Sequence, residues 1–499
     1  PRSPVRAMSA ADERRLWLAA VAAITALTLL RLYVVFATGL NLGPDEAQYW
    51  SWSLEPAFGY FSKPPMIAWI IAGMTSVCGD GEGCIRAASP LLYAVSALLI
   101  FEAGRLLYGA RVAFWSCLVF ATLPGVSFSA ALITTDVPLL AFWSAALLAL
   151  AALLRRPPAE SRLIALALGL AVGLAMMSKY AGGYFLLGLA LAALIDRRAR
   201  GHVLGLNGLL ILGGTLAMIA PNIVWNLQHG FATVSHTAYN AGLNGDLFHP
   251  ARLAEFAGAQ FGVFGPVLMG VIVAGLALGL RAKTWPRATD DDAVLLAISA
   301  PVLAVGLAIA FLSKANANWA APAYAGLALV ATRWLVENAN RKWLAASFAI
   351  ALLAGGALTA AALSPRFVEA IGQTNAFKLL RGWNTQGPAI ARAAREGGFE
   401  AVLAEDREDM ASLLYYTRRT GVPILMWTPE PGHPSDHYQM TKPYAGAPDR
   451  VLFVTRREDS SDVTGRFASA HESEIVSVTI GKDRQRTFRL IDLAGFKVD

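Results

Sequence analysis

The sequence predicts a polytopic α-helical membrane protein with a small α/β domain at its C-terminal end. Of its 499 residues, 56% are hydrophobic and only 15% are charged, and the mean hydropathy is +0.48. Soluble domains usually carry about 25% charged residues. The apolar residues also recur in runs of membrane-spanning length, and after residue 363 the chain becomes charge-rich with short strand-like runs. These features exclude an ordinary soluble globular protein.

Eleven apolar runs are predicted to be membrane-spanning helices. They occupy residues 16–36, 87–107, 112–129, 134–154, 162–177, 181–195, 203–224, 258–280, 293–313, 317–336 and 343–363. No small-residue cleavage site follows the first run, so we expect a retained helix rather than a signal peptide. A further run at 66–77 is too short to span comfortably and is predicted to be a re-entrant or interfacial element of the first loop, 37–86.

The basic residues alternate between loops. The N-terminal segment and every second loop after it hold most of the arginines and lysines of residues 1–363, and the intervening loops hold only Lys63, Arg86, Lys179, Arg252 and Lys314. Loops rich in Lys and Arg face the cytoplasm. The N-terminus is therefore predicted to be cytoplasmic, with residues 364–499 on the opposite side. We interpret the net charge of +7 as this topology signal rather than as a nucleic-acid surface.

Two cysteines lie in the first loop. Cys78 and Cys84 flank a glycine-rich turn, and we expect them to form a disulfide if the loop faces an oxidising compartment. Cys117 lies within an apolar run and is predicted to be buried. Two cysteines without nearby histidines are a weak signal for zinc.

The C-terminal segment is predicted to be a separate α/β domain. Its strand-like runs are Ala401–Ala404, Pro423–Trp427, Arg450–Val454 and Glu474–Ile480, with a helical stretch from Asp406 to Arg419. His433 and His437 lie in a loop rich in Pro and Gly, which we interpret as solvated rather than functional.

Nearly all the unusual polar residues fall in loops on the non-cytoplasmic side. Besides Asp45 and Glu46 of the first loop, these loops contain Tyr60, Lys63, Asp136, Lys179, Tyr180, Asn222, Asn226, His229, Lys314 and Asn318. Each residue taken alone also fits an interfacial position, because lysines snorkel and aromatic residues form interfacial belts. Because this side is poor in basic residues and several of its loops are short, we expect the set to form one site.

The residue types suggest transfer from an anionic lipid. Lysines and asparagine amides neutralise a phosphate leaving group, and a carboxylate accepts the proton of an attacking hydroxyl. We predict Asp45, Glu46 and Asp136 as catalytic. Tyr60, Lys63, Lys179, Tyr180, Asn222, Asn226, Lys314 and Asn318 are predicted to bind the donor phosphate or sugar. A divalent metal ion bound by Glu46 and His229 is a further hypothesis, although the spacing carries no metal signature.

Several segments resemble the protein O-mannosyltransferase superfamily, and within it the bacterial aminoarabinose and galacturonic acid lipid A transferase branch. They are the Asp45-Glu46 loop, Lys63-Pro64-Pro65, Asp136 after two threonines, Lys179 at the end of an apolar run, and Asn316–Tyr324. The resemblance covers about 1–330 and implies a membrane-embedded GT-C fold for the predicted membrane domain, 1–363. It does not extend to the tail, 364–499, which the loop charges alone predict to be a periplasmic domain. The large lumenal insert of the mannosyltransferases is missing.

The resemblance implies an inverting glycosyltransferase of the bacterial inner membrane. Its donor would be a polyprenyl-phosphate-linked sugar. Its acceptor would be lipid A, lipopolysaccharide or another envelope glycan, and membrane lipids would surround the protein. Asp45 matches the acidic residue usually assigned to catalysis, and Lys63 matches the lysine near the donor phosphate. The alternatives are a transporter or flippase for lipid-linked sugars, and a non-catalytic assembly factor. A translocation path should carry charges through the bilayer, whereas these polar residues are one-sided.

Overall fold

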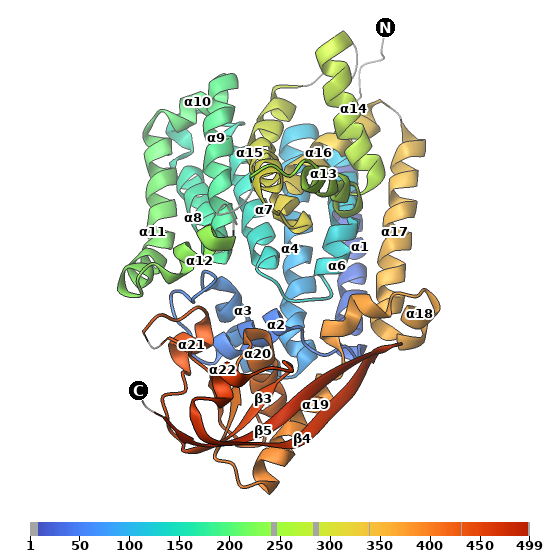
Figure 1. Ribbon diagram of the computed structural model, residues 1–499. Helices are drawn as coiled ribbons and strands as arrows, with labels where there is room; N and C mark the ends of the chain where they lie inside the picture. Colours follow the sequence, from blue (N-terminus) through green and yellow to red (C-terminus); the bar gives the residue numbers. More distant parts are fainter. Residues whose placement is uncertain (1–7, 241–246, 283–288, 339, 431, 498–499) are drawn as a thin grey trace. The chain divides into compact units, whose positions relative to one another are not determined.

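A computed structural model describes residues 8–240, 247–282, 289–338, 340–430 and 432–497 (Figure 1). The chain forms two compact units. The first comprises Pro1–Phe36, Lys63–Ile67 and Arg86–Thr359, and the second comprises Ala37–Ser62, Ala68–Ile85 and Ala360–Asp499. The predicted division of the chain into 1–363 and 364–499 stays a prediction. Most of the first loop, which the sequence assigned to the membrane domain, groups with the C-terminal residues.

The described part of the chain contains six helices that are long and apolar enough to cross a membrane. These are α1 (Ala10–Ala37), α4 (Glu82–Tyr108), α7 (Asp136–Leu153), α11 (Leu206–Gln228), α15 (Asp290–Leu312) and α17 (Arg341–Leu363). A bent pair, α13 (Pro250–Phe264) and α14 (Pro266–Ala282), raises the number to seven if it counts as one span. The predicted polytopic helical class is thus confirmed.

The predicted count of eleven spans is not confirmed. Runs 112–129, 162–177, 181–195 and 317–336 form helices of fewer than 18 residues, α5 (Ala110–Thr122), α8 (Arg162–Ser178), α9 (Tyr184–Ile195) and α16 (Ala321–Glu337). Local chemistry explains two of these. Pro124 separates α5 from α6 (Pro124–Ser129), because proline cannot continue a helix. The 317–336 run begins as a 3₁₀ turn, η3 (Ala317–Ala320). The 66–77 run forms the short helix α3 (Met66–Cys78), as its length predicts.

Short connecting helices complete the first unit. They are η1 (Pro158–Glu160), η2 (Tyr180–Gly183), α10 (Arg197–Val203) and α12 (Ala232–Asn240). Gly169 of α8 lies directly against α11, where an added Cβ would lie 2.2 Å from the Ile211 carbonyl oxygen. Small residues let membrane helices approach this closely. Figure 1 shows α8, α9, α10 and α11 gathered in one group.

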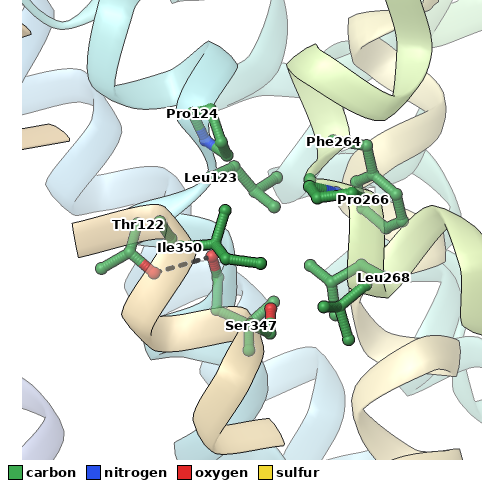
Figure 2. A pocket seen from close by; sticks show the side chains of 12 residues that line it. Thr122, Leu123, Pro124, Phe264, Pro266, Leu268, Ser347 and Ile350 are labelled. Carbon is green, nitrogen blue, oxygen red and sulfur yellow. Dashed lines mark hydrogen bonds between the residues drawn. The ribbon is translucent and has the colours of Figure 1, made fainter. Parts of the chain in front are cut away.

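Gly265 divides the predicted 258–280 run. Its φ of 95° lies in a region that favours glycine, and the pair α13–α14 bends there by 117°. Figure 2 shows the site of the bend, where side chains of α5–α6, α13–α14 and α17 point toward a small cavity of about 10 Å³. Phe264, Pro266 and Ile350 are among its walls. The bend therefore closes against an apolar surface.

A cluster of ion pairs joins the ends of several helices in the first unit. Arg155 and Arg198 both bind Asp291, at 3.1 and 2.9 Å from its Oδ1. Asp292 is fully buried, and it pairs with Arg333 and accepts a hydrogen bond of 2.7 Å from the Tyr108 hydroxyl. The three arginines come from loops that the sequence predicts to be cytoplasmic, and the structure brings them together at one acidic pair.

The second unit contains a five-stranded sheet of order β2-β1-β3-β5-β4. The strands are β1 (Ala401–Ala404), β2 (Ile424–Met426), β3 (Arg450–Thr455), β4 (Phe467–Gly481) and β5 (Arg484–Phe496). Strand β1 runs parallel to both β2 and β3, whereas β5 runs antiparallel to β3 and β4. Figure 1 shows β4 and β5 as the long pair. The helices of this unit are α2 (Pro44–Ser53), α18 (Pro365–Ala370), η4 (Thr374–Leu380), α19 (Trp383–Glu396), α20 (Arg407–Thr417), α21 (His437–Thr441) and α22 (Ser461–Thr464).

The predicted small C-terminal sheet is confirmed, and its four predicted strands are present. Strand β4 is longer than the predicted 474–480, and β5 was not predicted at all. Polar residues dominate the start of β5, but Arg486, Phe488 and Leu490 alternate inward. The Arg486 guanidinium lies 4.1 Å from the ring centroid of Trp383, so a buried arginine hides the strand pattern.

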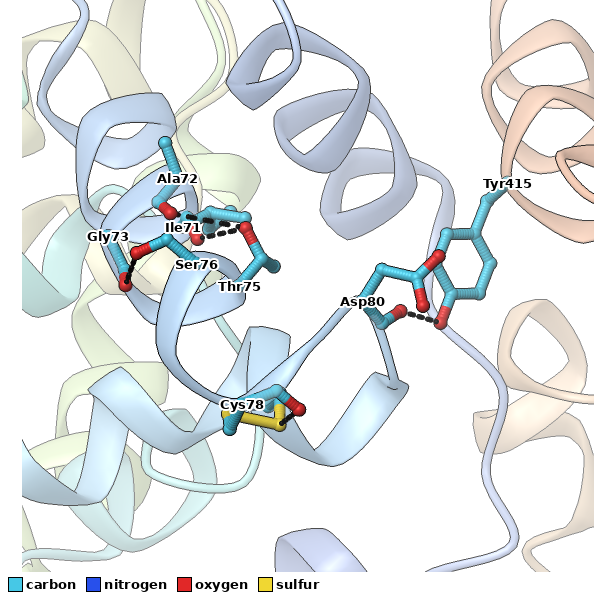
Figure 3. Close-up of a disulfide and its surroundings, with 9 residues drawn as sticks. Ile71, Ala72, Gly73, Thr75, Ser76, Cys78, Asp80 and Tyr415 are labelled. Carbon is cyan, nitrogen blue, oxygen red and sulfur yellow. Dashed lines mark hydrogen bonds between the residues drawn. A yellow bond between two sulfur atoms is a disulfide. The ribbon is translucent and has the colours of Figure 1, made fainter.

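The predicted disulfide between Cys78 and Cys84 is present (Figure 3). Within its loop, the Asp80 carbonyl accepts a hydrogen bond of 2.9 Å from the Tyr415 hydroxyl. The Asp80 carboxylate binds Arg418 at 2.6 Å and Arg419 at 3.1 Å. The Arg418 hydrogen bond lowers the pKa of Asp80. The disulfide therefore closes a turn that is tied to α20.

The buried Asp292 yields a stability prediction. Replacing Asp292→Ala removes the fully buried partner of the Arg333 guanidinium and leaves it the partly exposed Glu337, so the free energy of unfolding should fall by about 3–5 kcal/mol. Thermal unfolding of the detergent-solubilised protein measures the change. Asp290→Ala is the matched control, because Asp290 is exposed on the same helical turn. Equal melting temperatures for the two variants would contradict the structural role of Asp292.

Candidate functional site

The first candidate element is α2, which carries Asp45 and Glu46. Pro44 favours a helix start, and the Glu46 carboxylate accepts a 2.8 Å hydrogen bond from the backbone N–H of Gly43. Glu46 is buried. The structure therefore uses Glu46 to cap its own helix, and its predicted catalytic role stays a prediction.

Asp45 differs from its neighbour because its side chain is 66% exposed. Its Oδ1 lies 3.1 Å from Nη1 of Arg407, the first residue of α20. Arg407 also binds the side chain of Gln48, one turn further along α2. The second carboxylate oxygen of Asp45 makes no hydrogen bond within the described residues. Asp45 is thus held through one oxygen and open at the other.

Helix α2 packs closely on α20. The rings of Trp50 and Tyr415 meet edge to face with centroids 4.9 Å apart. The Tyr416 hydroxyl accepts a hydrogen bond of 2.7 Å from Leu42 N–H. The hydroxyls of Ser51 and Tyr438 lie 3.0 Å apart. These contacts fix the orientation of α2, so they also fix the direction of the Asp45 side chain.

Tyr60 packs in an aromatic group with Trp52 of this helix. Its ring stacks on Trp52 with centroids 4.6 Å apart, and its hydroxyl donates to the Trp52 carbonyl at 2.9 Å. Burial raises the pKa of Tyr60 to about 12, so the phenol stays protonated. Tyr60 supports the loop in this arrangement, and sugar binding by Tyr60 stays a prediction.

The interpretation of His437 as a solvated loop residue is wrong. His437 begins α21 and lies edge to face against Trp52 and Tyr60, with centroids 5.3 and 5.8 Å away. Burial lowers its pKa to about 4. The first-loop residues Trp52 and Tyr60 pack against this histidine, although the first loop is distant from it in the sequence. His433 is exposed, as predicted.

A second cluster lies in the first unit and centres on Asp136. Asp136 starts α7, and Lys179 directly follows α8. The Lys179 ammonium lies 2.7 Å from Asp136 Oδ1, and the Asn318 amide lies 2.5 Å from Oδ2. Both carboxylate oxygens are therefore engaged. Three residues from three predicted loops meet here, which fits Asp136 better as an anchor for Lys179 and Asn318 than as a free base.

A largely apolar cavity of about 320 Å³ adjoins this cluster. Asp136 and Asn318 line it together with mostly apolar and aromatic side chains. The larger ones are Tyr93, Phe120, Phe128, Leu140, Val263 and Tyr324. A long hydrocarbon chain matches such a lining, and the polar cluster matches a charged headgroup.

Tyr180, Asn222 and Asn226 form a third group. The Tyr180 hydroxyl donates to the side-chain Oδ1 of Asn222 at 2.8 Å and accepts from the Asn226 side-chain amide at 3.2 Å. The two asparagines lie four residues apart on one face of α11, which extends beyond the predicted 203–224 to Gln228. Most of these polar groups satisfy one another.

The remaining predicted residues are Lys63, Lys314 and His229. Lys63 is half-buried before Pro64, and Lys314 is exposed before η3. His229 is exposed and stacks on Trp225 with centroids 4.1 Å apart. No group of three or more His, Cys, Asp or Glu among the described residues is arranged to hold a metal ion. Metal binding by Glu46 and His229 stays a prediction that this geometry does not support.

The sequence did not predict Arg407 or Gln48. Arg407 lies in the run Glu405-Asp406-Arg407-Glu408-Asp409, directly after the predicted strand Ala401–Ala404. Ligands often bind at the carboxyl ends of parallel strands. The charged run directly after the predicted strand could therefore have indicated Arg407 as a site residue. Its partner on α2 lies 362 residues away, so no local pattern connects the two.

The comparisons with known proteins agree with one another. Residues 62–225 match the family model described as dolichyl-phosphate-mannose-protein mannosyltransferase. The lipid A galacturonosyltransferase RgtD of Rhizobium johnstonii is 32% identical over 431 residues, which are 86% of this chain and 89% of that protein. The lipopolysaccharide core galacturonosyltransferase RgtA of the same organism is 31% identical over 206 residues, 41% of this chain and 40% of that protein.

The fold is shared with a solved enzyme. The crystal structure of ArnT from Cupriavidus metallidurans bound to undecaprenyl phosphate matches with a TM-score of 0.64. The match covers 95% of this chain and 97% of that chain at 17% identity. This likeness shows a common fold, and the likeness to RgtD shows the family.

His437 gives a pH-dependent prediction. Its folded pKa of about 4 lies below the usual value of about 6.5. Its contribution to the free energy of unfolding is therefore complete above about pH 6.5 and is lost as the pH falls toward about 4. Thermal unfolding near pH 7.5 and about pH 4.5 should show a smaller acid-induced loss for His437→Gln than for the unchanged protein.

The exposed His433→Gln is the matched control and should keep the full loss. Burial raises the pKa of Asp409 to about 7, so acid acts on that group in the opposite direction. This effect is present in all three proteins and cancels in the comparison. Identical acid-induced losses in the unchanged protein and His437→Gln would contradict the prediction.

Proposed function

Because this chain belongs to the GT-C membrane glycosyltransferase family, in the branch that contains RgtD and ArnT, we propose that it transfers galacturonic acid from a polyprenyl-phosphate-linked donor to lipid A. The sugar and the acceptor are those in the name of RgtD. The structural observation that carries the proposal is the apolar cavity of about 320 Å³ whose lining includes Asp136 and Asn318.

In this proposal the cavity takes the end of the polyprenyl chain next to the phosphate. Lys179 and Asn318, fixed by Asp136, then neutralise the phosphate as it leaves. Lys63 adds a second positive charge to the phosphate. A uronic acid needs a further cationic partner for its carboxylate, and the exposed Lys314 is the candidate.

The reaction forms a bond between an acceptor oxygen and the anomeric carbon of the sugar. The bond from that carbon to the phosphate oxygen breaks, and its electron pair leaves with the polyprenyl phosphate. A hydroxyl acceptor passes its proton to Asp45. A phosphate acceptor needs no base, and Asp45 then stabilises positive charge that develops on the sugar.

We also propose the number of membrane spans and the side of the membrane on which each part of the chain lies. The short helices α5, α8, α9 and α16 complete an eleven-span arrangement in the bacterial inner membrane. The N-terminus is cytoplasmic and the second unit is periplasmic. The gathering of Arg155, Arg198 and Arg333 at Asp291 and Asp292 supports one basic face. The disulfide supports an oxidising location for the first loop.

A direct assay tests the transfer. Purified protein is incubated with polyprenyl-phosphate galacturonic acid and lipid A, and mass spectrometry should find lipid A heavier by one hexuronic acid residue. Asp45→Ala, Lys63→Ala and Lys179→Ala should each reduce the rate by about 100-fold or more. Lys342→Ala, an exposed lysine outside the site, should leave the rate unchanged.

Melting temperatures and gel-filtration profiles of the variants separate loss of function from misfolding. Near-normal turnover in the three site variants would overturn the site assignment. Movement of the donor across vesicles without a heavier lipid A would favour transport instead.

Arg407 gives a prediction about positioning. Arg407→Ala removes the group that holds Asp45 Oδ1, so kcat should fall by about tenfold while KM for the donor changes little. Arg407→Lys keeps the charge and should recover part of kcat. Arg419→Ala is the control, because Arg419 is an exposed arginine beside the end of the same helix. A rise in KM with unchanged kcat would contradict the positioning role.

A further inference from the structure

The second unit holds a cavity at the carboxyl ends of its parallel strands. Strand β1 lies between β2 and β3, and the chain passes from β1 to β2 on one side before it reaches β3 on the other. Such a reversal of strand order opens a crevice at the carboxyl ends of the strands, where α/β sheets bind ligands. The cavity has a volume of about 510 Å³.

The segments that follow these strands supply its walls. Glu405 and Asp406 follow β1, Trp427 follows β2, and Arg456 and Arg457 follow β3. Asp409, Pro429, Gln439 and Asp462 complete the lining. This site is separate from Asp45, whose carboxylate is not among the lining residues.

The two arginines of the cavity are already neutralised. Arg456 lies 2.7 Å from Asp409 and 3.4 Å from Asp406. Arg457 lies 2.5 Å from Glu405 and 2.9 Å from Asp462. Four carboxyl groups therefore face two guanidinium groups, and the carboxyl groups remain in excess when the buried Asp409 is partly protonated. An anionic ligand would meet an excess of negative charge, so the cavity disfavours phosphates and uronic acids.

A metal ion does not match this cavity either. The described residues contain no group of three or more acidic, histidine or cysteine side chains placed to hold one. The carboxylates are instead fixed by arginines in paired contacts. They present hydrogen-bond acceptors in set directions, and the arginines add donors between them.

The Asp409 carboxyl group can both accept and donate a hydrogen bond near neutral pH. It is buried, and burial raises its pKa to about 7. Near neutral pH its carboxyl group therefore exists partly in a form that donates a hydrogen bond. A ligand whose polar groups both donate and accept, such as a hydroxyl, matches this behaviour.

The cavity also has an apolar wall. Trp427 packs against Phe467 and Phe496, with ring centroids 6.3 and 6.1 Å away, which fixes its orientation. Pro429 lies close to it in the chain and also lines the cavity. A sugar ring combines an apolar C–H surface with a rim of hydroxyls, and it needs both kinds of wall.

We infer that this cavity is a carbohydrate-binding site for a sugar residue without acidic groups, either a neutral hexose or an amino sugar. Its volume lies within the range of small-molecule sites, about 300–1,000 Å³. The excess of carboxyl groups favours an ammonium group over a carboxylate on the ring. The site therefore has the opposite charge preference to a site for a galacturonic acid donor, and it binds sugar independently of the transfer reaction.

Saturation-transfer NMR on the full-length protein in nanodiscs tests this inference. The probes are glucose, glucosamine and galacturonic acid at equal concentration. Glucose and glucosamine should receive saturation from the protein, and galacturonic acid should receive several-fold less. Asp462→Arg places a bulky cation at the rim of the cavity and should weaken glucose and glucosamine binding by about tenfold or more.

Asp483→Arg is the matched control, because Asp483 is exposed in the turn between β4 and β5 and does not line the cavity. Glu405→Gln is a second variant that keeps the side-chain shape, and it should weaken glucosamine more than glucose. Equal binding by Asp462→Arg and the control would overturn the site, and preferred binding of galacturonic acid would overturn its charge preference. Neither result depends on whether the protein transfers sugar.

Discussion

The free energy that it costs to leave a charge unpaired inside an apolar domain determines which helices of the first unit lie together. Asp292 is fully buried and Asp136 nearly so, and each is bound to a cation from a distant segment. A buried charge without its partner costs several kcal/mol, so these pairs constrain which helices lie together. Asp292 joins α15 to α16, and Asp136 joins the starts and ends of α7, α8 and η3. The same constraint thus organises both the scaffold and the proposed phosphate site.

The sequence predicted what depends on local composition. The membrane class, the small C-terminal sheet and the disulfide follow from hydropathy, strand-like runs and the spacing of Cys78 and Cys84. Topology placed Asp136, Lys179 and Asn318 on one face, and the structure brings all three into contact. The predicted count of eleven spans is not confirmed, because an apolar run does not reveal where Pro124 or Gly265 interrupts a helix.

Local sequence patterns could not predict contacts between segments that are far apart in the chain. His437 looked solvated because its covering residues, Trp52 and Tyr60, come from the first loop. Arg407 lacked a visible partner for the same reason. Strand β5 was missed because Arg486 occupies an inward position that usually holds an apolar residue. The ring of Trp383 and the carbonyl of Arg381, to which Arg486 donates a hydrogen bond, accommodate it there. In each case the deciding interaction joins chain segments far apart in the sequence.

The separation of Asp45 and Arg407 along the sequence also affects how the protein folds during synthesis. The two residues are 362 positions apart, and ribosomes add about 5–20 residues per second. Helix α2 therefore leaves the ribosome roughly 20 to 70 s before α20 exists. During that interval Trp50 and the rest of its α20-facing surface have no native partner. The native surroundings of Asp45 are therefore completed only after Arg407 and the rest of α20 have been synthesised.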